Sequence, residues 1–140
     1  MEIVTNPESA TQLVGGSTTF NCAASGTPPL NFMWYKDRES AALVAEGSVS
    51  ISNQPNESSL TLTNIAASDA CAYYCVASND LVAGRFMSNS TPATLTVHGK
   101  YYLCNGFTLY IQVHISVSLC AKALNLILFS CSSCGDSHKS

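Results

Sequence analysis

The stretch Asp69-Ala70-Cys71-Ala72-Tyr73-Tyr74-Cys75 contains the residues that decide the fold of this chain. Tyr73, Cys75 and Ala77 occupy every second position, so they share one face of an extended segment. This period of two predicts a β-strand with one buried face. The predicted strand carries a tyrosine two residues before a cysteine, on the same face as that cysteine.

Short strands separated by turns are predicted on both sides of this stretch. Residues 20–24 alternate apolar with other side chains before a Ser-Gly-Thr-Pro-Pro turn at 25–29. Residues 32–35 form a second β-rich run, and residues 59–63 and 94–97 alternate apolar residues with threonine. No amphipathic helix of useful length is expected before residue 99. This pattern predicts an all-β sandwich or barrel.

Four aromatic and cysteine positions identify the type of sandwich. Trp34 follows Cys22 by twelve residues, Cys75 follows Cys22 by 53, and Tyr73 precedes Cys75 by two. This order resembles the immunoglobulin superfamily, in which two cysteines join the sheets beside a tryptophan and a conserved tyrosine corner. Residues 59–65 and 75–79 resemble the I-set subgroup in particular, and the resemblance extends over about residues 2–98.

The resemblance implies an immunoglobulin-like Greek-key β-sandwich at residues 1–98, followed by an apolar tail. It implies a disulfide between Cys22 and Cys75, which would contribute roughly 4 kcal/mol for a loop of about 50 residues. The core signature of the family would fall on four residues of this chain: Trp34, Leu62, Asp69 and Tyr73.

Two positions depart from the family pattern. Cys71 occupies a place where such domains usually carry Gly or Ala. No Arg or Lys occurs between Arg38 and Asp69, so the base that often pairs with this aspartate is expected to be absent. Asp69 would then serve its own loop by accepting backbone N–H groups.

The composition divides the 140 residues at about residue 98. Charged residues make up 11% of the whole chain and the net charge is −3, which argues against a nucleic-acid-binding protein with a basic face. Residues 1–98 carry eight acids and three bases, whereas residues 99–140 carry three lysines and one acid. Four of the seven cysteines lie in this second region. The two regions therefore follow different compositional rules.

The tail at residues 99–140 admits several interpretations. Apolar residues alternate without a break from 109 to 119, as in a strand, and residues 121–129 form a short apolar run. The tail would add an extra strand plus a short helix, form a marginal membrane segment interrupted by Lys122, or be poorly ordered. Cys131, Cys134 and His138 form a weak candidate metal site within it.

Two N-glycosylation sequons lie in polar turn regions. Asn56 begins Asn-Glu-Ser, and Asn89 begins Asn-Ser-Thr. Pro92 follows the second sequon directly and makes Asn89 the poorer acceptor. A glycan on either residue would require a secreted or cell-surface protein.

The segment between the last two predicted strands is the best candidate for partner binding, because recognition usually resides in loops on a rigid scaffold. Tyr35 should point outward, opposite Trp34, and join the same contact face. Alternatively, Phe86 and Met87 begin the last strand and pack inside. The candidate contact residues are Tyr35, Leu81, Val82, Arg85 and Phe86.

Function follows from these features as an expectation. No catalytic constellation, phosphate loop or cofactor motif occurs, so we expect a non-enzymatic protein–protein recognition module. The sequons and the disulfide favour a cell-adhesion or receptor protein at the cell surface, with homophilic or heterophilic contacts between immunoglobulin domains. The start lacks a secretory signal, so the chain would be a fragment, anchored to the membrane through the tail or a missing segment. The alternative is a cytoplasmic, structural I-set module like those of muscle scaffold proteins.

Overall fold

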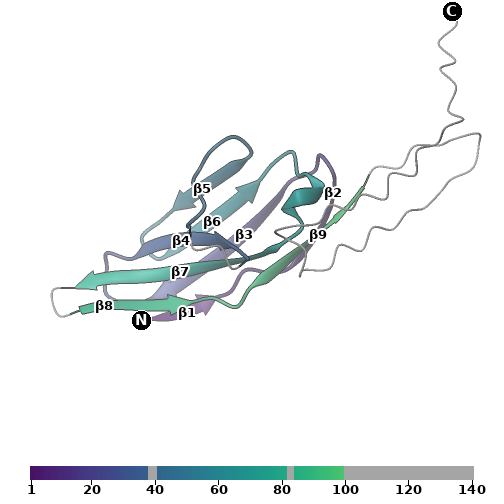
Figure 1. Ribbon diagram of the computed structural model, residues 1–140. Coiled ribbons are helices and arrows are strands. Elements are labelled where there is room, and N and C mark those ends of the chain that lie inside the picture. The colour runs from purple at the N-terminus through teal and green to yellow at the C-terminus, as the bar shows by residue number, and fades with distance from the viewer. Residues whose placement is uncertain (38–40, 82–83, 100–140) are drawn as a thin grey trace, which may run out of the picture.

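The computed structural model describes residues 1–37, 41–81 and 84–99 (Figure 1). The first strands are β1 (Glu2–Thr5), β2 (Ala10–Leu13), β3 (Thr18–Ser25), β4 (Asn31–Lys36) and β5 (Val49–Asn53). They are followed by β6 (Glu57–Leu62), a 3₁₀ turn η1 (Ala67–Asp69), β7 (Ala72–Leu81), β8 (Gly84–Asn89) and β9 (Ala93–His98). The prediction of an all-β fold is confirmed, with one 3₁₀ turn added between β6 and β7.

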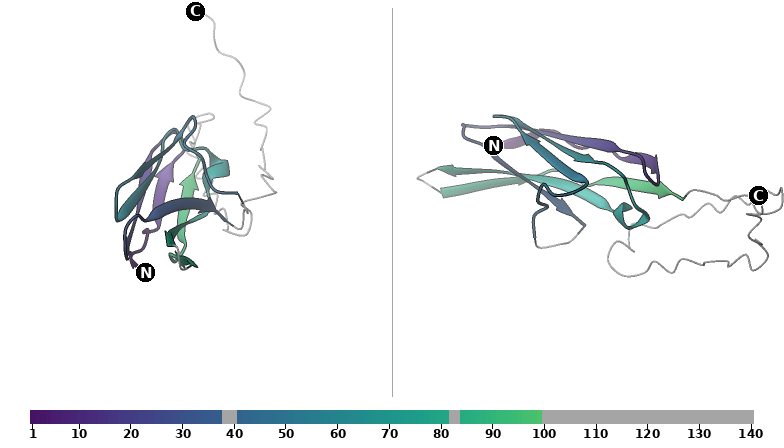
Figure 2. Two further views of the ribbon diagram at one scale, coloured as in Figure 1. Left: turned by 90° about the vertical axis from the view of Figure 1, so that its left-hand side faces the viewer. Right: turned by 90° about the horizontal axis from the view of Figure 1, so that it is seen from above.

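The strands form two packed sheets, seen as two layers in the right-hand view of Figure 2. One sheet has the order β1-β3-β6-β5, and the other has the order β2-β9-β7-β4 with β8 paired to β7. Neighbouring strands are antiparallel except β2 and β9, which run parallel from Ala10↔Leu95 to Leu13↔His98. Strands distant in sequence are therefore neighbours, as the predicted Greek-key sandwich requires.

The core lies between the two sheets and follows the period of two along β3, β4, β6 and β9, whereas residues 75–79 of β7 are all buried. In β4 the buried residues are Phe32 and Trp34, and in β9 they are Ala93, Leu95 and Val97. Side chains on alternate positions of a strand point to opposite faces, so one set fills the core and the other faces outward. A strand with this alternation therefore has one face in the core and one face toward the outside.

The strands β7 and β8 form a long hairpin that projects beyond the rest of the sandwich (Figures 1 and 2). Their register runs from Val76↔Asn89 to Leu81↔Gly84. Gly84 has a φ of 142°, which glycine adopts without the steric cost that a Cβ would add. The hairpin carries most of the residues that the sequence nominated for partner binding.

Candidate functional site

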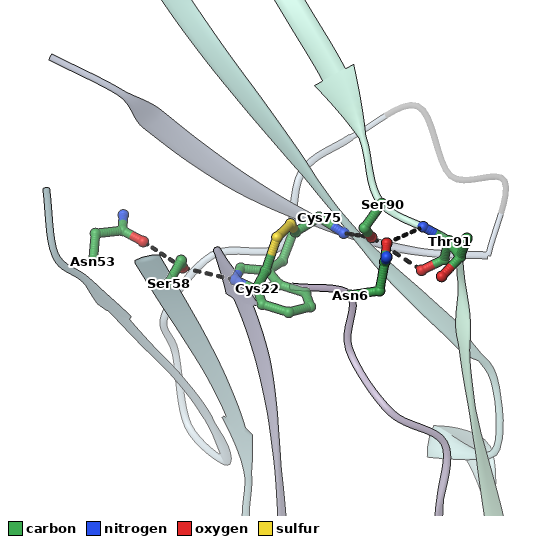
Figure 3. The surroundings of a disulfide bond; sticks show 8 residues. Asn6, Cys22, Asn53, Ser58, Cys75, Ser90 and Thr91 are labelled. Atoms are coloured by element: carbon green, nitrogen blue, oxygen red, sulfur yellow. Dashed lines mark hydrogen bonds between the residues drawn. A yellow bond between two sulfur atoms is a disulfide. The ribbon is translucent and has the colours of Figure 1, made fainter. Parts of the chain in front are cut away.

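The predicted disulfide between Cys22 and Cys75 is present and joins β3 of one sheet to β7 of the other (Figure 3). The two Cα atoms are 6.5 Å apart, and both residues are buried. Because β3 and β7 are central strands of their sheets, this bond fixes the two layers at their middle.

Trp34 is fully buried and pairs with Cys75 in the register of β4 and β7, so it lies beside the disulfide. Its indole N–H is satisfied by a short chain of hydrogen bonds through Ser58 and Asn53, two residues labelled in Figure 3. Trp34 Nε1 donates to Ser58 Oγ at 2.9 Å, and Ser58 Oγ donates to Asn53 Oδ1 at 2.6 Å. A buried indole N–H usually finds such an acceptor, since leaving it unpaired is costly. Ser58 is opposite Cys22 in the register of β3 and β6, so the acceptor lies at the level of the disulfide.

Ser90 forms two hydrogen bonds with the backbone of Cys75 (Figure 3). The Cys75 backbone N–H donates to Ser90 Oγ at 2.9 Å, and the Ser90 N–H donates to the Cys75 carbonyl at 2.9 Å. The neighbouring Thr91 N–H donates to Asn6 Oδ1 at 2.8 Å. Hydrogen bonds therefore connect Asn6, near the start of the domain, with Thr91, near its end, and connect Ser90 with β7.

Tyr73 forms the tyrosine corner at the start of β7. Its hydroxyl donates to the Asp69 carbonyl oxygen at 2.9 Å, and its ring stacks on Phe20 with centroids 5.4 Å apart. Asp69 Oδ2 accepts the Ala66 N–H at 2.9 Å, which is the local role expected for this carboxylate. Leu62 lies in the same core, which closes this end of the sandwich.

The expectation that Asp69 has no basic partner is wrong. Lys36 Nζ lies 3.6 Å from Asp69 Oδ1 and also donates to the Ser68 carbonyl oxygen at 3.0 Å. The lysine is at the end of β4, where the register pairs it with Tyr73 beside the corner. The base therefore comes from the end of β4, two residues before the interval between Arg38 and Asp69.

Cys71, the second departure from the family pattern, lies in the core. Its side chain is fully buried, and its sulfur is 3.7 Å from the Ser68 carbonyl oxygen. Its own carbonyl accepts the Leu95 N–H at 2.8 Å, so the residue also joins β7 to β9. The position thus serves packing at the corner.

The outer face of β4, β7 and β8 is the most distinctive surface of the described residues. We define the outer face by the residues of these strands that point away from the core, as the registers assign them: Met33, Tyr35, Tyr74, Val76, Ser78, Asp80, Arg85, Met87 and Asn89. Val76 and Ser78 belong to it by direction but are themselves buried, at 4% and 1% exposure. Tyr35 and Tyr74 stack at its centre, with ring centroids 5.3 Å apart and planes 14° from parallel. The Tyr35 hydroxyl lies 3.7 Å from Met33 Sδ.

Charged and apolar side chains meet at the hairpin end of the outer face. Arg85 Nε lies 3.5 Å from Asp80 Oδ1, and both side chains are more than half exposed. Met87, two residues along the same face, is 53% exposed. The outer face therefore combines an aromatic pair, an exposed apolar side chain and an exposed ion pair.

The five candidate contact residues divide between the two sides of the sheet. Tyr35 and Arg85 share the outer face, whereas Phe86 pairs with the buried Asn79 and faces the opposite side, where it is 57% exposed. Val82 lies outside the described residues, and Leu81 is described only in its backbone. The alternative that Phe86 and Met87 pack inside is wrong, because both lie in β8 but remain exposed beyond the core.

Sequence reasoning missed Tyr74, Met33 and Asp80 as members of this face. Their period-two positions were visible, but nothing in the sequence aligned β4 with β7 or β7 with β8. The register supplies that alignment: Tyr35 pairs with Tyr74 and Arg85 with Asp80.

The two sequons lie on different sheets. Asn56 is exposed in the turn between β5 and β6, at the edge of the first sheet. Asn89 is exposed at the end of β8, on the outer face beside Val76. A glycan on Asn89 would cover the outer face, and one on Asn56 would leave it open.

The described residues contain no cluster of three metal-ligating side chains. Nor do they include a helix long and apolar enough to cross a membrane. The candidate metal ligands Cys131, Cys134 and His138 lie outside the described residues, as do the strand, helix and membrane interpretations of the tail from residue 100 onward. Those predictions stay predictions.

A two-sheet sandwich with a central disulfide, a buried tryptophan and a tyrosine corner defines the immunoglobulin class of domains. Residues 1–97 match the family model of the immunoglobulin I-set domain, and the chain belongs to this family. The resemblance inferred from the positions of the cysteines, Trp34 and Tyr73 is thereby confirmed. Members of the family are generally binding modules.

Two curated relatives match the same region. The limbic system-associated membrane protein of Mus musculus is 30% identical over 98 residues, which cover 70% of this chain and 26% of that protein. A peroxidasin homologue of Caenorhabditis elegans is 33% identical over 97 residues, covering 69% of this chain and 7% of that protein. The chain thus spans only a small part of either relative.

Solved structures with the same fold include a fragment of titin and a module of a receptor protein. An I-band fragment of titin is 31% identical, covers 69% of this chain and 32% of its own, and superposes with a TM-score of 0.58. The N-terminal two-domain module of the Drosophila receptor protein tyrosine phosphatase DLAR is 27% identical, with a TM-score of 0.56 over 70% of this chain and 48% of its own. The fold is therefore shared by proteins of different kinds.

Proposed function

We propose that this chain is a recognition module of a cell-surface adhesion or receptor protein, and that it binds another immunoglobulin-like domain through the outer face. The observation that carries the proposal is the combination of the Tyr35–Tyr74 stack, the exposed Met87 and the Asp80–Arg85 pair on one sheet surface. Aromatic side chains, Met and Arg are the residues enriched at protein interfaces.

The charges on the outer face favour a like-to-like contact. A two-fold interface needs one surface that is complementary to itself. Asp80 and Arg85 supply one charge of each sign at the same end of the face, so each could pair with its opposite on a second copy. The apolar centre would then be buried between two copies with no charge left unpaired.

A location outside the cell is supported by three observations. Asn56 and Asn89 are both exposed, as a glycan requires, and the Cys22–Cys75 disulfide is typical of an oxidising compartment. The similarity to a membrane-associated protein of the limbic system points the same way. Labelling of intact cells that express the gene, with a reagent that cannot cross the membrane, tests this location.

Bead clustering tests the binding face. Beads coated with the full chain should cluster, and Met87→Glu should reduce clustering about tenfold or more, because it buries an unpaired charge at the contact. Val4→Glu is the matched control, since Val4 is 60% exposed on β1 of the opposite sheet. Unchanged clustering by Met87→Glu would reject the outer face, and no clustering by the unmodified chain would reject the like-to-like contact.

The alternative is a structural module inside the cell, and the likeness to the titin fragment at 31% identity favours it. In that case the outer face would pack against a neighbouring scaffold domain and the sequons would remain unmodified. Protection of the protein from surface labelling, together with unmodified Asn56, would favour this alternative over the adhesion protein.

A further inference from the structure

The sequon at Asn56 has an exposed acceptor and a buried hydroxyl. Asn56 is exposed in the β5–β6 turn, but Ser58, which completes the sequon, is only 1% exposed. The Ser58 hydroxyl is the acceptor for the Trp34 indole and the donor to Asn53. The same hydroxyl is required by the enzyme that recognises the sequon, because Asn-x-Ser without that serine is no acceptor. The two uses of Ser58 exclude one another in the folded chain.

The backbone around the sequon is also fixed by hydrogen bonds. The Asn56 carbonyl accepts the Ala24 N–H at 2.9 Å, and the Gln54 N–H donates to the Glu57 carbonyl at 2.8 Å. In the registers, Ser58 pairs with Cys22 on one side and with Asn53 on the other. To expose the Ser58 hydroxyl, β6 would have to separate from both neighbouring strands beside the disulfide. Ser58 is the second residue of β6, so the start of this strand would have to open against both neighbours.

We propose that Asn56 is an N-glycosylation site whose acceptor motif is available only before the sandwich closes. The Asn56 amide nitrogen would form a bond to the first sugar carbon of an oligosaccharide carried on a polyprenyl pyrophosphate. The sugar–oxygen bond to the pyrophosphate breaks, the amide loses one proton, and the lipid pyrophosphate leaves with the electron pair. In a cell this step needs the secretory pathway, so its occurrence there rests on the proposed function.

Closure of the sandwich and modification of Asn56 would therefore compete. The Cys22–Cys75 bond fixes β3 at the position opposite Ser58, and Trp34 then takes the hydroxyl. After modification, the glycan would project from the β5–β6 turn while Ser58 enters the core as before. The order of events is thus modification first and oxidation second.

Transfer in vitro tests the proposal without reference to cellular location. The full chain, made without glycan, is incubated with purified oligosaccharyltransferase and a lipid-linked oligosaccharide, either folded and oxidised or reduced and carboxymethylated. A short Asn-x-Thr peptide in both reactions reports that the enzyme is active. Mass spectrometry should find Asn56 modified in the unfolded chain and at least about tenfold less in the folded chain. Equal modification of both forms, or none of the unfolded chain, would overturn the proposal.

Substitutions separate the two roles of Ser58. Ser58→Ala should abolish transfer to the unfolded chain and also lower the urea midpoint of the glycan-free folded chain, because Trp34 loses its acceptor. Asn56→Gln should abolish transfer and leave the midpoint unchanged, and Ser58→Thr should retain transfer. A midpoint unaffected by Ser58→Ala would show that the hydroxyl is not committed to the core, which overturns the proposal. These results are independent of the surface-labelling experiment.

Discussion

The inner and outer sides of the β4–β7 pair are built from alternating residues of the same two strands. On the inner side Trp34 pairs with Cys75 and Lys36 with Tyr73, next to the disulfide and the tyrosine corner. On the outer side Tyr35 pairs with Tyr74, and their rings stack in a half-buried position. One register therefore creates two aromatic arrangements, one enclosed by the second sheet and one facing solvent.

Under the proposed function, this difference would separate stability, carried by the inner side, from recognition, carried by the outer side. An enclosed side chain that is shortened leaves a cavity, whereas an outer side chain leaves a gap that water fills. Neighbouring positions on one strand should then respond in opposite ways: the inner substitution lowers the free energy of unfolding, and the outer substitution lowers binding. Each matched pair of substitutions below tests this separation.

The largest contrast is expected between Trp34→Ala and Tyr35→Ala. Removal of the fully buried indole should cost about 3–5 kcal/mol of a total free energy of unfolding of about 5–15 kcal/mol. Loss of the half-buried Tyr35 ring should lower the free energy of unfolding only by the stacking energy of the Tyr35–Tyr74 pair, about 0.5–1.5 kcal/mol. Urea unfolding followed by circular dichroism measures both, and equal losses would contradict the separation of the two sides.

A smaller contrast is expected between Tyr73→Phe and Tyr74→Phe. The first removes the hydroxyl that donates to the Asp69 carbonyl and should lower the free energy of unfolding by about 0.5–1.5 kcal/mol. The second removes a hydroxyl on the outer face and should change it by less than about 0.5 kcal/mol. Thermal unfolding of the two variants side by side distinguishes them. A greater loss in Tyr74→Phe would show that the outer tyrosines hold the sheet together.

The smallest contrast is between the two ion pairs. The side chains of Lys36 and Asp69 are 18% and 26% exposed, whereas those of Arg85 and Asp80 are 52% and 63% exposed. Lys36→Met should therefore cost up to about 1 kcal/mol, and Arg85→Met should cost close to nothing. Arg85→Met should nevertheless weaken bead clustering. Both variants are first shown to be fully folded. If Lys36→Met then reduces clustering more than Arg85→Met does, the role proposed for Arg85 is excluded.

Much of the inner side could be predicted from the sequence, because its determinants are local. Cys22, Trp34, Tyr73 and Cys75 lie in alternating runs at characteristic spacings, and these spacings suffice to place them in a sandwich core. The Lys36–Asp69 pair could not be predicted in this way, because it depends on how the end of β4 lies against the 3₁₀ turn η1. Lys36 is far from Asp69 along the chain, so the sequence around Asp69 does not indicate this partner.

The outer face was less predictable, because it depends on register. Arg85 and Phe86 are neighbours in sequence and must point to opposite sides, but only the pairing of β8 with β7 assigns Arg85 to the outer face and Phe86 to the other side. The residues of β8 are almost all exposed, so no alternation of polarity fixes that register in advance. The position of Asn89 on the outer face likewise follows only from the pairing of β8 with β7.

The parallel pairing of β2 with β9 has a mechanical consequence. Tension that enters the chain before β2 and leaves after β9 pulls these two strands in opposite directions along their length, because they run parallel. Hydrogen bonds loaded in this direction share the force and must break together. The β7–β8 hairpin, pulled from its open end, would instead release one pair at a time. The domain should therefore resist extension along the chain more strongly than it resists peeling of the β7–β8 hairpin.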